Sequence, residues 1–445
     1  MVSISRSRSR LLAVFVVGYI LLTAVGSPAQ TLIGGSCSRD TTFTSANGPY
    51  KLSGALNIYN CTVTFEHGAS VDLNGKIIAV GYSAKAGTLI ADGVTFTNSA
   101  ASATYLSFTA GSGGTVRNCI FDNVYVYIVT GTPEITSCTF RNVANPFRFN
   151  GQHAHPAISG NTYEGLADPR ILLYSSFDIT ASDTLKKYDI PYALYSGMSV
   201  YGGTLTIEPG TDIDLRSGTV TVGTTGKPGV LMADKAVFRS SGTSDAVLSF
   251  VEGSGGTLSG CTLDNVYVSV EDGRPRIEGC TIRNVKYPLA LKGTAAEPVF
   301  TGNAFESLEK AKISVAGFTL AGVDTLCRRE LPYELTGSIT VSGGNLTIES
   351  GISLDMMSST VTVGASGKPG TLNADGVAFS SGSTSDHAIV FAYTSGGTLA
   401  NCTLDNVYVS VAEATPVIAG CTFMNVNCPR SEEHTSELQS RQVIS

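Results

Sequence analysis

A sequence unit of about 142 residues occurs three times in this chain, and such a fixed internal period is the signature of a repeat architecture. The unit is recognised by the segments NCIFDNVYV (118–126), GCTLDNVYV (260–268) and NCTLDNVYV (401–409). The same spacing relates VTFEHGASVDL (63–73), LTIEPGTDIDL (205–215) and LTIESGISLDM (346–356). The chain of 445 residues is therefore expected to build its core by stacking similar units.

A smaller unit recurs inside each copy, where an apolar residue precedes each turn. The steps between these apolar residues are the same in the first two copies, and the third copy begins with the same two steps. Apolar positions alternate around these sites, as in Cys402, Leu404, Val407 and Val409, which is typical of strands and not of helices. The recurring residues are Phe96, Phe121, Phe140 and Tyr163, then Phe238, Leu263, Ile282 and Phe305, then Phe379, Leu404 and Phe423.

Short strands and tight turns also fit the composition, which includes 49 Gly and only 15% charged residues. A single coil of such strands cannot bury its own apolar face, whereas stacked coils pair each strand with the next and share one core. The sequence therefore predicts an all-β parallel solenoid of about 17 coils, each about 4.8 Å above the last.

The recurring Cys-Thr-[Phe/Leu/Ile]-x-Asn-Val coil and GGTLTIEPGTDIDL (202–215) resemble the right-handed parallel β-helix proteins of the pectate-lyase-like superfamily, of secreted bacterial type. The resemblance covers residues 45–429 and implies a right-handed β-helix. For function it implies little, because that scaffold serves lyases, hydrolases, adhesins and passive stalks. The Asn-Thr-Asp, Gly-His-Gly and Arg-Ile-Lys motifs of its polygalacturonase-like members do not occur in this sequence.

The two ends of the chain read differently from the repeats. Residues 1–29 combine three Arg, an apolar run and Ser27-Pro28-Ala29, the layout of a signal peptide, and no later segment resembles a membrane span. From Arg430 to Ser440, RSEEHTSELQS resembles the translation of a common sequencing adapter, so 430–445 is interpreted as an assembly artefact. The predicted organisation between them is a cap at 30–44 and super-repeats at 45–184, 185–326 and, incomplete, 327–429.

Two sets of repeated polar residues are expected to serve the coil. Asn tolerates left-handed turns, and stacked carboxamides can form ladders. The two cysteines of each pair occupy the same position in consecutive coils, so each pair forms either an inter-coil disulfide or two buried free thiols. The asparagines are Asn123, Asn142, Asn265, Asn284, Asn406 and Asn425, and the pairs are Cys119-Cys138, Cys261-Cys280 and Cys402-Cys421.

Carboxylates and histidines supply the candidates for chemistry. Glu66, Glu208 and Glu349 are each followed, six positions later, by an aspartate: Asp72, Asp214 and Asp355. A pair repeated three times along one stack favours coil geometry over a glycosidase site, where two carboxylates converge on one bond. His153 and His155 have no counterpart in the second copy, so they are the candidate catalytic residues, although a polar loop explains them as well. No cofactor or metal site is indicated.

The chain is acidic, with a formal net charge of −7, which argues against a nucleic-acid partner. It contains no Trp, so outward Tyr125, Tyr267 and Tyr408 are the candidates for stacking on sugars. The functional expectation is a secreted or cell-surface, non-catalytic scaffold, an adhesin or a stalk that binds polysaccharide or a cell-surface glycan. The alternative is a polysaccharide lyase or glycoside hydrolase on the same fold. The oligomeric state does not follow from the sequence.

Overall fold

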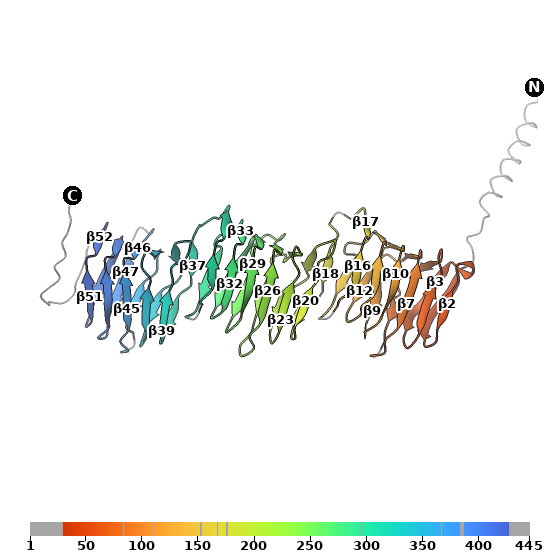
Figure 1. The fold of residues 1–445 in the computed structure, drawn as a ribbon, viewed down its shortest axis with the longest axis horizontal. Helices are drawn as coiled ribbons and strands as arrows, with labels where there is room; N and C mark the ends of the chain where they lie inside the picture. The colour runs from red at the N-terminus through yellow and green to blue at the C-terminus, as the bar shows by residue number, and fades with distance from the viewer. Residues whose placement is uncertain are drawn as a thin grey trace, which may run out of the picture. The chain divides into compact units, whose positions relative to one another are not determined.

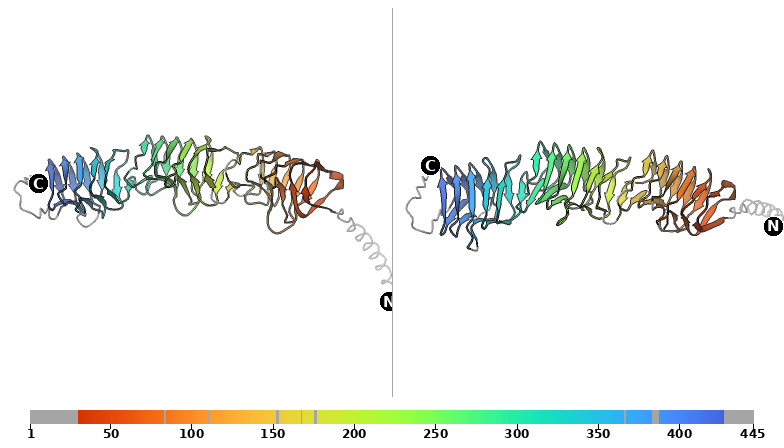
Figure 2. Two further views of the ribbon diagram at one scale, coloured as in Figure 1. Left: turned by 90° about the horizontal axis from the view of Figure 1, so that it is seen from below. Right: turned by 60° about the horizontal axis from the view of Figure 1, so that its bottom comes forward.

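The computed structural model describes residues 30–426, except 83, 110, 152–153, 167, 175–176, 295, 366 and 383–386. The predicted signal peptide, the adapter-like segment and His153 lie outside the described residues. The chain divides into two compact units, the first containing residues up to 148 together with 154–169 and the second containing the rest. Each unit is a stack of coils built from short parallel strands (Figure 1, Figure 2).

The first unit begins with β1 (Thr31–Cys37), which pairs in parallel with β3 (Tyr50–Ile58). One column of its coils contains β2 (Thr41–Phe43), β4 (Thr62–Phe65), β7 (Thr88–Asp92), β10 (Gly113–Arg117), β13 (Glu134–Thr136) and β16 (Ala157–Ser159). A second contains β5 (Ser70–Asp72), β8 (Thr95–Thr97), β11 (Ile120–Asp122), β14 (Thr139–Arg141) and β17 (Thr162–Glu164). A third contains β6 (Ile78–Val80), β9 (Thr104–Phe108), β12 (Val124–Ile128) and β15 (Phe147–Phe149).

The second unit repeats this plan, with one change of column. The first stack of its earlier coils contains β20 (Asp183–Leu185), β23 (Thr204–Ile207), β26 (Val230–Asp234), β29 (Gly255–Ser259), β32 (Arg274–Glu278) and β35 (Val299–Thr301). The second stack contains β18 (Ile171–Leu173), β21 (Tyr192–Leu194), β24 (Asp212–Asp214), β27 (Val237–Arg239), β30 (Thr262–Asp264), β33 (Thr281–Arg283) and β36 (Ala304–Glu306). The third stack contains β19 (Phe177–Ile179), β22 (Met198–Val200), β25 (Thr219–Val222), β28 (Ala246–Val251), β31 (Val266–Glu271) and β34 (Leu289–Lys292).

The last five coils of this unit form three further stacks. The first contains β39 (Val323–Leu326), β42 (Asn345–Ile348), β45 (Thr371–Asp375), β48 (Gly396–Ala400) and β51 (Thr415–Ala419). The second contains β37 (Ile313–Val315), β40 (Tyr333–Leu335), β43 (Ser353–Asp355), β46 (Ala378–Ser380), β49 (Thr403–Asp405) and β52 (Thr422–Met424). The third contains β38 (Phe318–Leu320), β41 (Ile339–Val341), β44 (Val361–Val363), β47 (His387–Phe391) and β50 (Val407–Val411).

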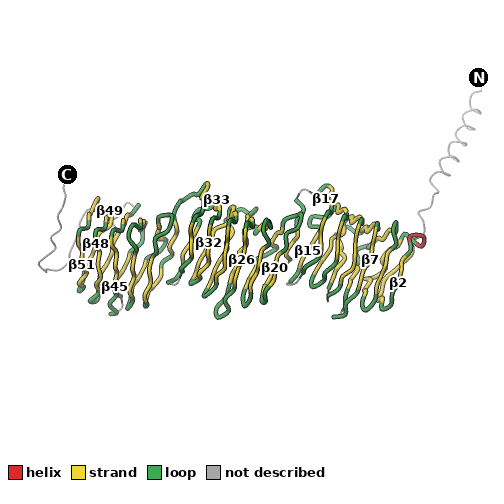
Figure 3. The backbone as a smooth tube through the Cα atoms, viewed as in Figure 1, coloured by secondary structure: helices red, strands yellow, loops and turns green. Residues whose placement is uncertain are grey.

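The column change occurs at β37. This strand pairs with β34 on one side and β40 on the other, so the third stack of the earlier coils continues as the second stack of the later ones. Helix is confined, among the described residues, to the short 3₁₀ segment η1 (Ser45–Asn47) (Figure 3).

The residues whose spacing predicted the coils lie in register. Phe121 pairs with Phe96 on one side and Phe140 on the other, and the ring centroids are 5.2 and 4.7 Å apart. In the second unit Phe238, Leu263 and Ile282 form the corresponding row. These side chains are almost fully buried, so the shared core is the interior of the stack. The predicted all-β parallel solenoid of about 17 coils is confirmed. The handedness and the super-repeat boundaries stay predictions.

A glycine at one coil position is required because two backbones approach closely. Gly114, Gly256 and Gly397 occupy this position in the three copies, and a Cβ on any of them would lie 2.0 Å from a carbonyl oxygen of the previous coil. Their φ values, from 119° to 127°, also lie in a region that other residues rarely adopt. The close approach therefore fixes the residue type independently of any function.

We expect Gly256→Ala to destabilise the second unit by roughly 3 kcal/mol, since the new methyl group would clash with the Leu231 carbonyl and strain the backbone. Gly322→Ala is the matched control, because a Cβ there meets nothing within 4 Å. Thermal unfolding followed by circular dichroism measures the difference. Equal melting temperatures for the two variants would contradict the packing described here.

Candidate functional site

A groove of about 830 Å³ lies on the outer face of the second unit. It crosses β19, β22, β25, β28 and β31, whose outward residues follow one another in register. Asp178 pairs with Ser199, Ser199 with Thr221, and Thr221 continues through Ser249 to Ser269. Because neighbouring strands are about 4.8 Å apart, these five strands give the groove a length of about 19 Å.

A projecting loop at residues 223–228 forms one wall of the groove. Thr224 and Lys227 close it through two backbone hydrogen bonds of 3.0 and 2.8 Å. The buried Ser254 Oγ accepts a hydrogen bond from the Gly229 N–H at 3.2 Å, which anchors the loop base to the next coil. The same arrangement recurs with Ser112 and Ser395, so the loop itself belongs to the coil design.

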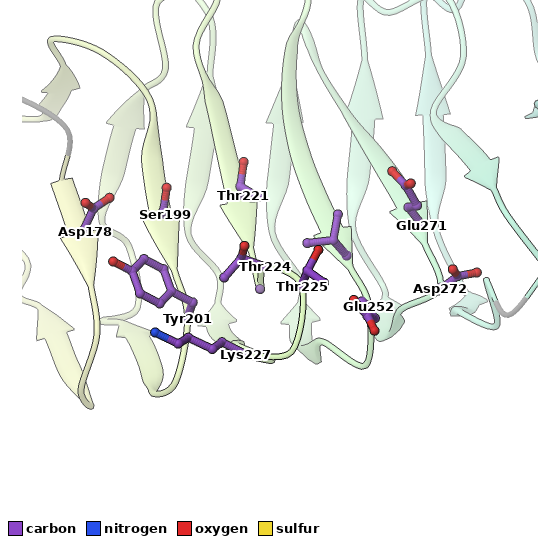
Figure 4. Close-up of a pocket in the computed structure, with 12 residues that line it drawn as sticks. Asp178, Ser199, Tyr201, Thr221, Thr224, Thr225, Lys227, Glu252, Glu271 and Asp272 are labelled. Atoms are coloured by element: carbon purple, nitrogen blue, oxygen red, sulfur yellow. The ribbon is translucent and has the colours of Figure 1, made fainter.

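The groove is polar and acidic. Figure 4 shows Asp178 at one end, Glu252, Glu271 and Asp272 at the other, and Tyr201 with Lys227 between them. The Lys227 ammonium lies 5.7 Å from the centroid of the Tyr201 ring, a cation–π arrangement. Four carboxylates thus face one lysine, which gives the lining a negative charge.

Glu252 and Glu271 differ from most carboxylates of this solenoid. Within the described part of the chain, neither makes an ion pair or a side-chain hydrogen bond, although Glu271 is in register with Lys292. Asp264, by contrast, is paired with Arg283 at 2.8 Å. Burial alone would raise the pKa of Asp264, but hydrogen bonds from Asn284 and Arg283 hold it below its usual value.

Three of the four groove acids, Asp178, Glu252 and Glu271, occur in the second copy alone. At the equivalent positions of the first copy, Asp178, Glu252, Glu271 and Asp272 are replaced by Ser36, Ala110, Val129 and Thr130. In the third copy they are replaced by Thr319, Tyr393, Ala412 and Glu413. Lys227, in contrast, has a counterpart in each copy, Lys85 and Lys368. The coil therefore does not need the acids, which makes them candidates for a function of this one region.

The repeated glutamates and aspartates singled out in the sequence bind backbone N–H groups of neighbouring coils. Glu66, Glu208 and Glu349 accept from Ser45, Lys187 and Arg328 at 3.3, 2.7 and 2.5 Å. Each of the three aspartates accepts one hydrogen bond from the backbone N–H two positions later and one from a backbone N–H of the next coil. The donors are Asn74 and Ser99 for Asp72, Arg216 and Ser241 for Asp214, and Met357 and Gly382 for Asp355. Each carboxylate fixes a turn, and the structure does not bring the pairs into the groove.

The repeated asparagines occupy left-handed turn positions. Their φ values run from 54° to 58°, a conformation that Asn adopts more readily than most residues. Asn142, Asn284 and Asn425 also donate to an aspartate of the preceding coil at 2.6 Å. The six residues are Asn123, Asn142, Asn265, Asn284, Asn406 and Asn425.

The cysteine pairs are stacked as free thiols in the structure: Cys119 with Cys138, Cys261 with Cys280, and Cys402 with Cys421. In the second pair, the hydrogen bond with Cys280 and burial both raise the pKa of Cys261, so the thiol stays protonated near neutral pH. Cys428 lies outside the described residues.

None of the described histidine and tyrosine candidates is among the residues that line the groove. His155 is half-buried in the first unit, and its neighbour His153 is outside the described residues. Tyr125 is buried, with the Arg148 guanidinium 3.9 Å from its ring centroid, while Tyr267 and Tyr408 are half-buried. Sequence reasoning missed Tyr201 and the four groove acids. A comparison of the copies position by position would have found Asp178, Glu252 and Glu271, which have no acidic counterpart in the other copies.

An ion cluster lies beside the column change at β37. Lys312 Nζ is 2.6 Å from Asp355 Oδ2 and 3.1 Å from Glu334 Oε2, and Lys310 Nζ is 2.6 Å from Glu334 Oε1. Tyr287 also donates to Glu334, whose side chain is only 2% exposed. Burial would raise the pKa values of both carboxyl groups, but the lysine hydrogen bonds hold them below their usual range. The cluster is thus fully charged at neutral pH.

Because these folded-state pKa values are depressed, the cluster stabilises the fold above the ordinary carboxyl pKa of about 4 and loses that contribution as the pH falls further. Lys312→Met should cost roughly 1 to 2 kcal/mol at neutral pH, less than a fully buried pair because Lys312 is 30% exposed. It should also move acid unfolding to higher pH, measured by circular dichroism. Lys292→Met, on an exposed lysine with no ion pair among the described residues, is the control; an unchanged acid midpoint in Lys312→Met would contradict this role.

Searches of protein-family models, curated proteins and solved structures found no match to this chain. Within the described ranges, no group of three or more His, Cys, Asp and Glu side chains is positioned to hold a metal ion. No helix among those residues has the length and apolar character needed to cross a bilayer.

Proposed function

We propose that this protein is an exported, non-catalytic β-solenoid scaffold that binds a glycan in the groove of its second super-repeat. Export rests on the predicted signal peptide at residues 1–29, and placement at the cell surface or outside the cell follows from it. The observation that supports binding is the groove itself, whose acids are absent at the corresponding positions of the first copy and, except for Glu413, of the third.

The lining suits an extended chain of sugars. Ser199 and Thr221 are in register on adjacent strands, and Thr224 and Thr225 add hydroxyl groups from the projecting loop. Hydroxyl and carboxylate groups can hydrogen-bond to sugar hydroxyls, and Tyr201 offers an aromatic ring. A groove of about 19 Å, open along the stack, can hold several linked sugars.

A scaffold is favoured over an enzyme because the carboxylates repeated along the chain are used by the coil. Glu208 and Asp214, for example, both accept hydrogen bonds from backbone N–H groups near their own turns. The alternative, a polysaccharide lyase or glycoside hydrolase, predicts turnover, which the same experiment detects.

The test is binding of the full chain to a panel of neutral, acidic and amine-bearing polysaccharides, followed by calorimetry on any that bind. Tyr201→Ala should weaken binding roughly tenfold, since it removes an aromatic contact from the groove. Tyr59→Ala is the matched control, because Tyr59 occupies the equivalent place beside Lys85 in the first copy.

Assays for unsaturated products and for new reducing ends are run on the same panel. Binding without either product, weakened only by Tyr201→Ala, supports the proposal. Steady release of either product would identify an enzyme, and an absence of binding to every polysaccharide would refute the glycan-binding role.

A further inference from the structure

We infer that the groove of the second super-repeat selects a polysaccharide bearing protonated amines, such as a polymer of glucosamine. This inference rests on the proposed function, because it names the ligand class of the same groove. It is carried by the charge of the lining, by a buried hydroxyl group that lacks a partner among the described residues, and by the way the groove already holds one ammonium group.

The charge of the groove lining is complementary to that of a cationic ligand. Four carboxylates and one lysine line the groove, and Glu252 and Glu271 are both exposed. A ligand with carboxylates of its own would meet repulsion there, whereas a ligand with ammonium groups would meet attraction. Glu252 and Glu271 make no ion pair with another described residue, so a cationic ligand would not have to displace an existing partner.

Ser269 on β31 is the residue whose buried hydroxyl group lacks a partner among the described residues. Val268 and Val270 are fully buried on the inner face, so strand alternation directs Ser269 and Glu271 to the groove side. Ser269 is 1% exposed, and its Oγ has no hydrogen-bond partner within the part of the chain that the structure describes. A buried hydroxyl without a partner is uncommon in proteins, and here it lies in the row that includes Thr221 of the groove lining. Ser269 does not itself line the groove, but it precedes the lining residue Glu271 by two positions on the same face of β31. A polar group of the ligand that enters beside Glu271 would be placed to satisfy it.

Lys227 shows how the groove surrounds an ammonium group. Its ammonium group lies 5.7 Å from the centroid of the Tyr201 ring, and the other ionisable side chains among the described lining residues are all acidic. The lining therefore already accommodates one ammonium group against an aromatic ring and among carboxylates. Amine groups spaced along a polymer would meet the same chemistry at both ends of the groove, at Asp178 and at Glu271 (Figure 4).

A sugar polymer is favoured over a basic peptide by the remaining lining residues. Ser199, Thr221 and Thr225 offer hydroxyl groups along the groove, which match the many hydroxyl groups of a sugar chain. The groove runs across the strands and not along a strand edge, so it offers no row of backbone N–H and C=O groups from its described strands to an extended peptide.

The experiment compares the full chain's affinity for two hexamers, one of β-linked glucosamine and one of β-linked N-acetylglucosamine, in a mildly acidic buffer that protonates the free amines. We expect the glucosamine hexamer to bind at least about tenfold more tightly, and its affinity to fall as salt is added. The double variant Glu252→Gln, Glu271→Gln should weaken its binding about three- to tenfold and leave the acetylated hexamer unaffected.

Glu413→Gln is the matched control, because Glu413 is the exposed acid at the Asp272 position of the third copy. It should change neither affinity. Thermal melting of the double variant checks that it folds, which is expected because both glutamates are exposed and unpaired among the described residues. If a basic peptide of the same charge bound as tightly as the glucosamine hexamer, charge alone would determine binding, and the assignment to a sugar would be overturned.

The outcomes separate this inference from the proposed function. Equal or tighter binding of the acetylated hexamer would overturn the inference while leaving a glycan-binding groove. If the double variant lost the same factor of affinity for both hexamers, the inference would also be overturned, because the acids would then not distinguish a charged ligand from an uncharged one. If neither hexamer binds while another polysaccharide does, the ligand class is wrong, and if no polysaccharide binds, the proposed function fails as well.

Discussion

The structure depends on the in-register stacking of parallel coils. A coil of three short strands cannot bury its inward side chains by itself, and the coils before and after it complete the burial, as the row Phe96, Phe121 and Phe140 illustrates. Burial of apolar surface between coils is therefore the main stabilising term, and it is gained only if each coil repeats the path of the last. Close backbone approaches such as that at Gly256, and anchors such as Ser254, follow from this requirement.

Departures from simple stacking are stabilised by charge. At β37 the strand columns change partner, and Glu334 occupies a position where the previous copy has Ala193. A buried carboxylate is costly without partners, and here Lys310, Lys312 and Tyr287 supply them. Arg170 and Asp214 form a comparable buried pair one copy earlier, 2.9 Å apart. The lysine-carboxylate cluster thus lies where the strands change column.

The sequence predicted the fold because the same spacing that aligns the core residues is visible as a period in the chain. The recurring steps between Phe238, Leu263, Ile282 and Phe305 bring these residues into one row, as the strand pairing shows. The column change could not be predicted, because it depends on how strands meet in space and leaves the period intact. The groove was missed for a related reason: repetition reveals residues that the coil needs, whereas Asp178, Glu252 and Glu271 are informative through their absence from the other copies.

From this contrast we infer that the repeated residues build the stack and that binding is confined to the one groove whose acids break the repetition. Hydrogen exchange of the full chain, followed by mass spectrometry with and without the glucosamine hexamer, tests it most directly. We expect slower exchange in the segments around Tyr201, the 223–228 loop and Glu271, and unchanged exchange at the equivalent segments around Tyr59 and Ser342. Equal protection at all three equivalent segments would contradict it, because binding would then follow the repeat and not the groove.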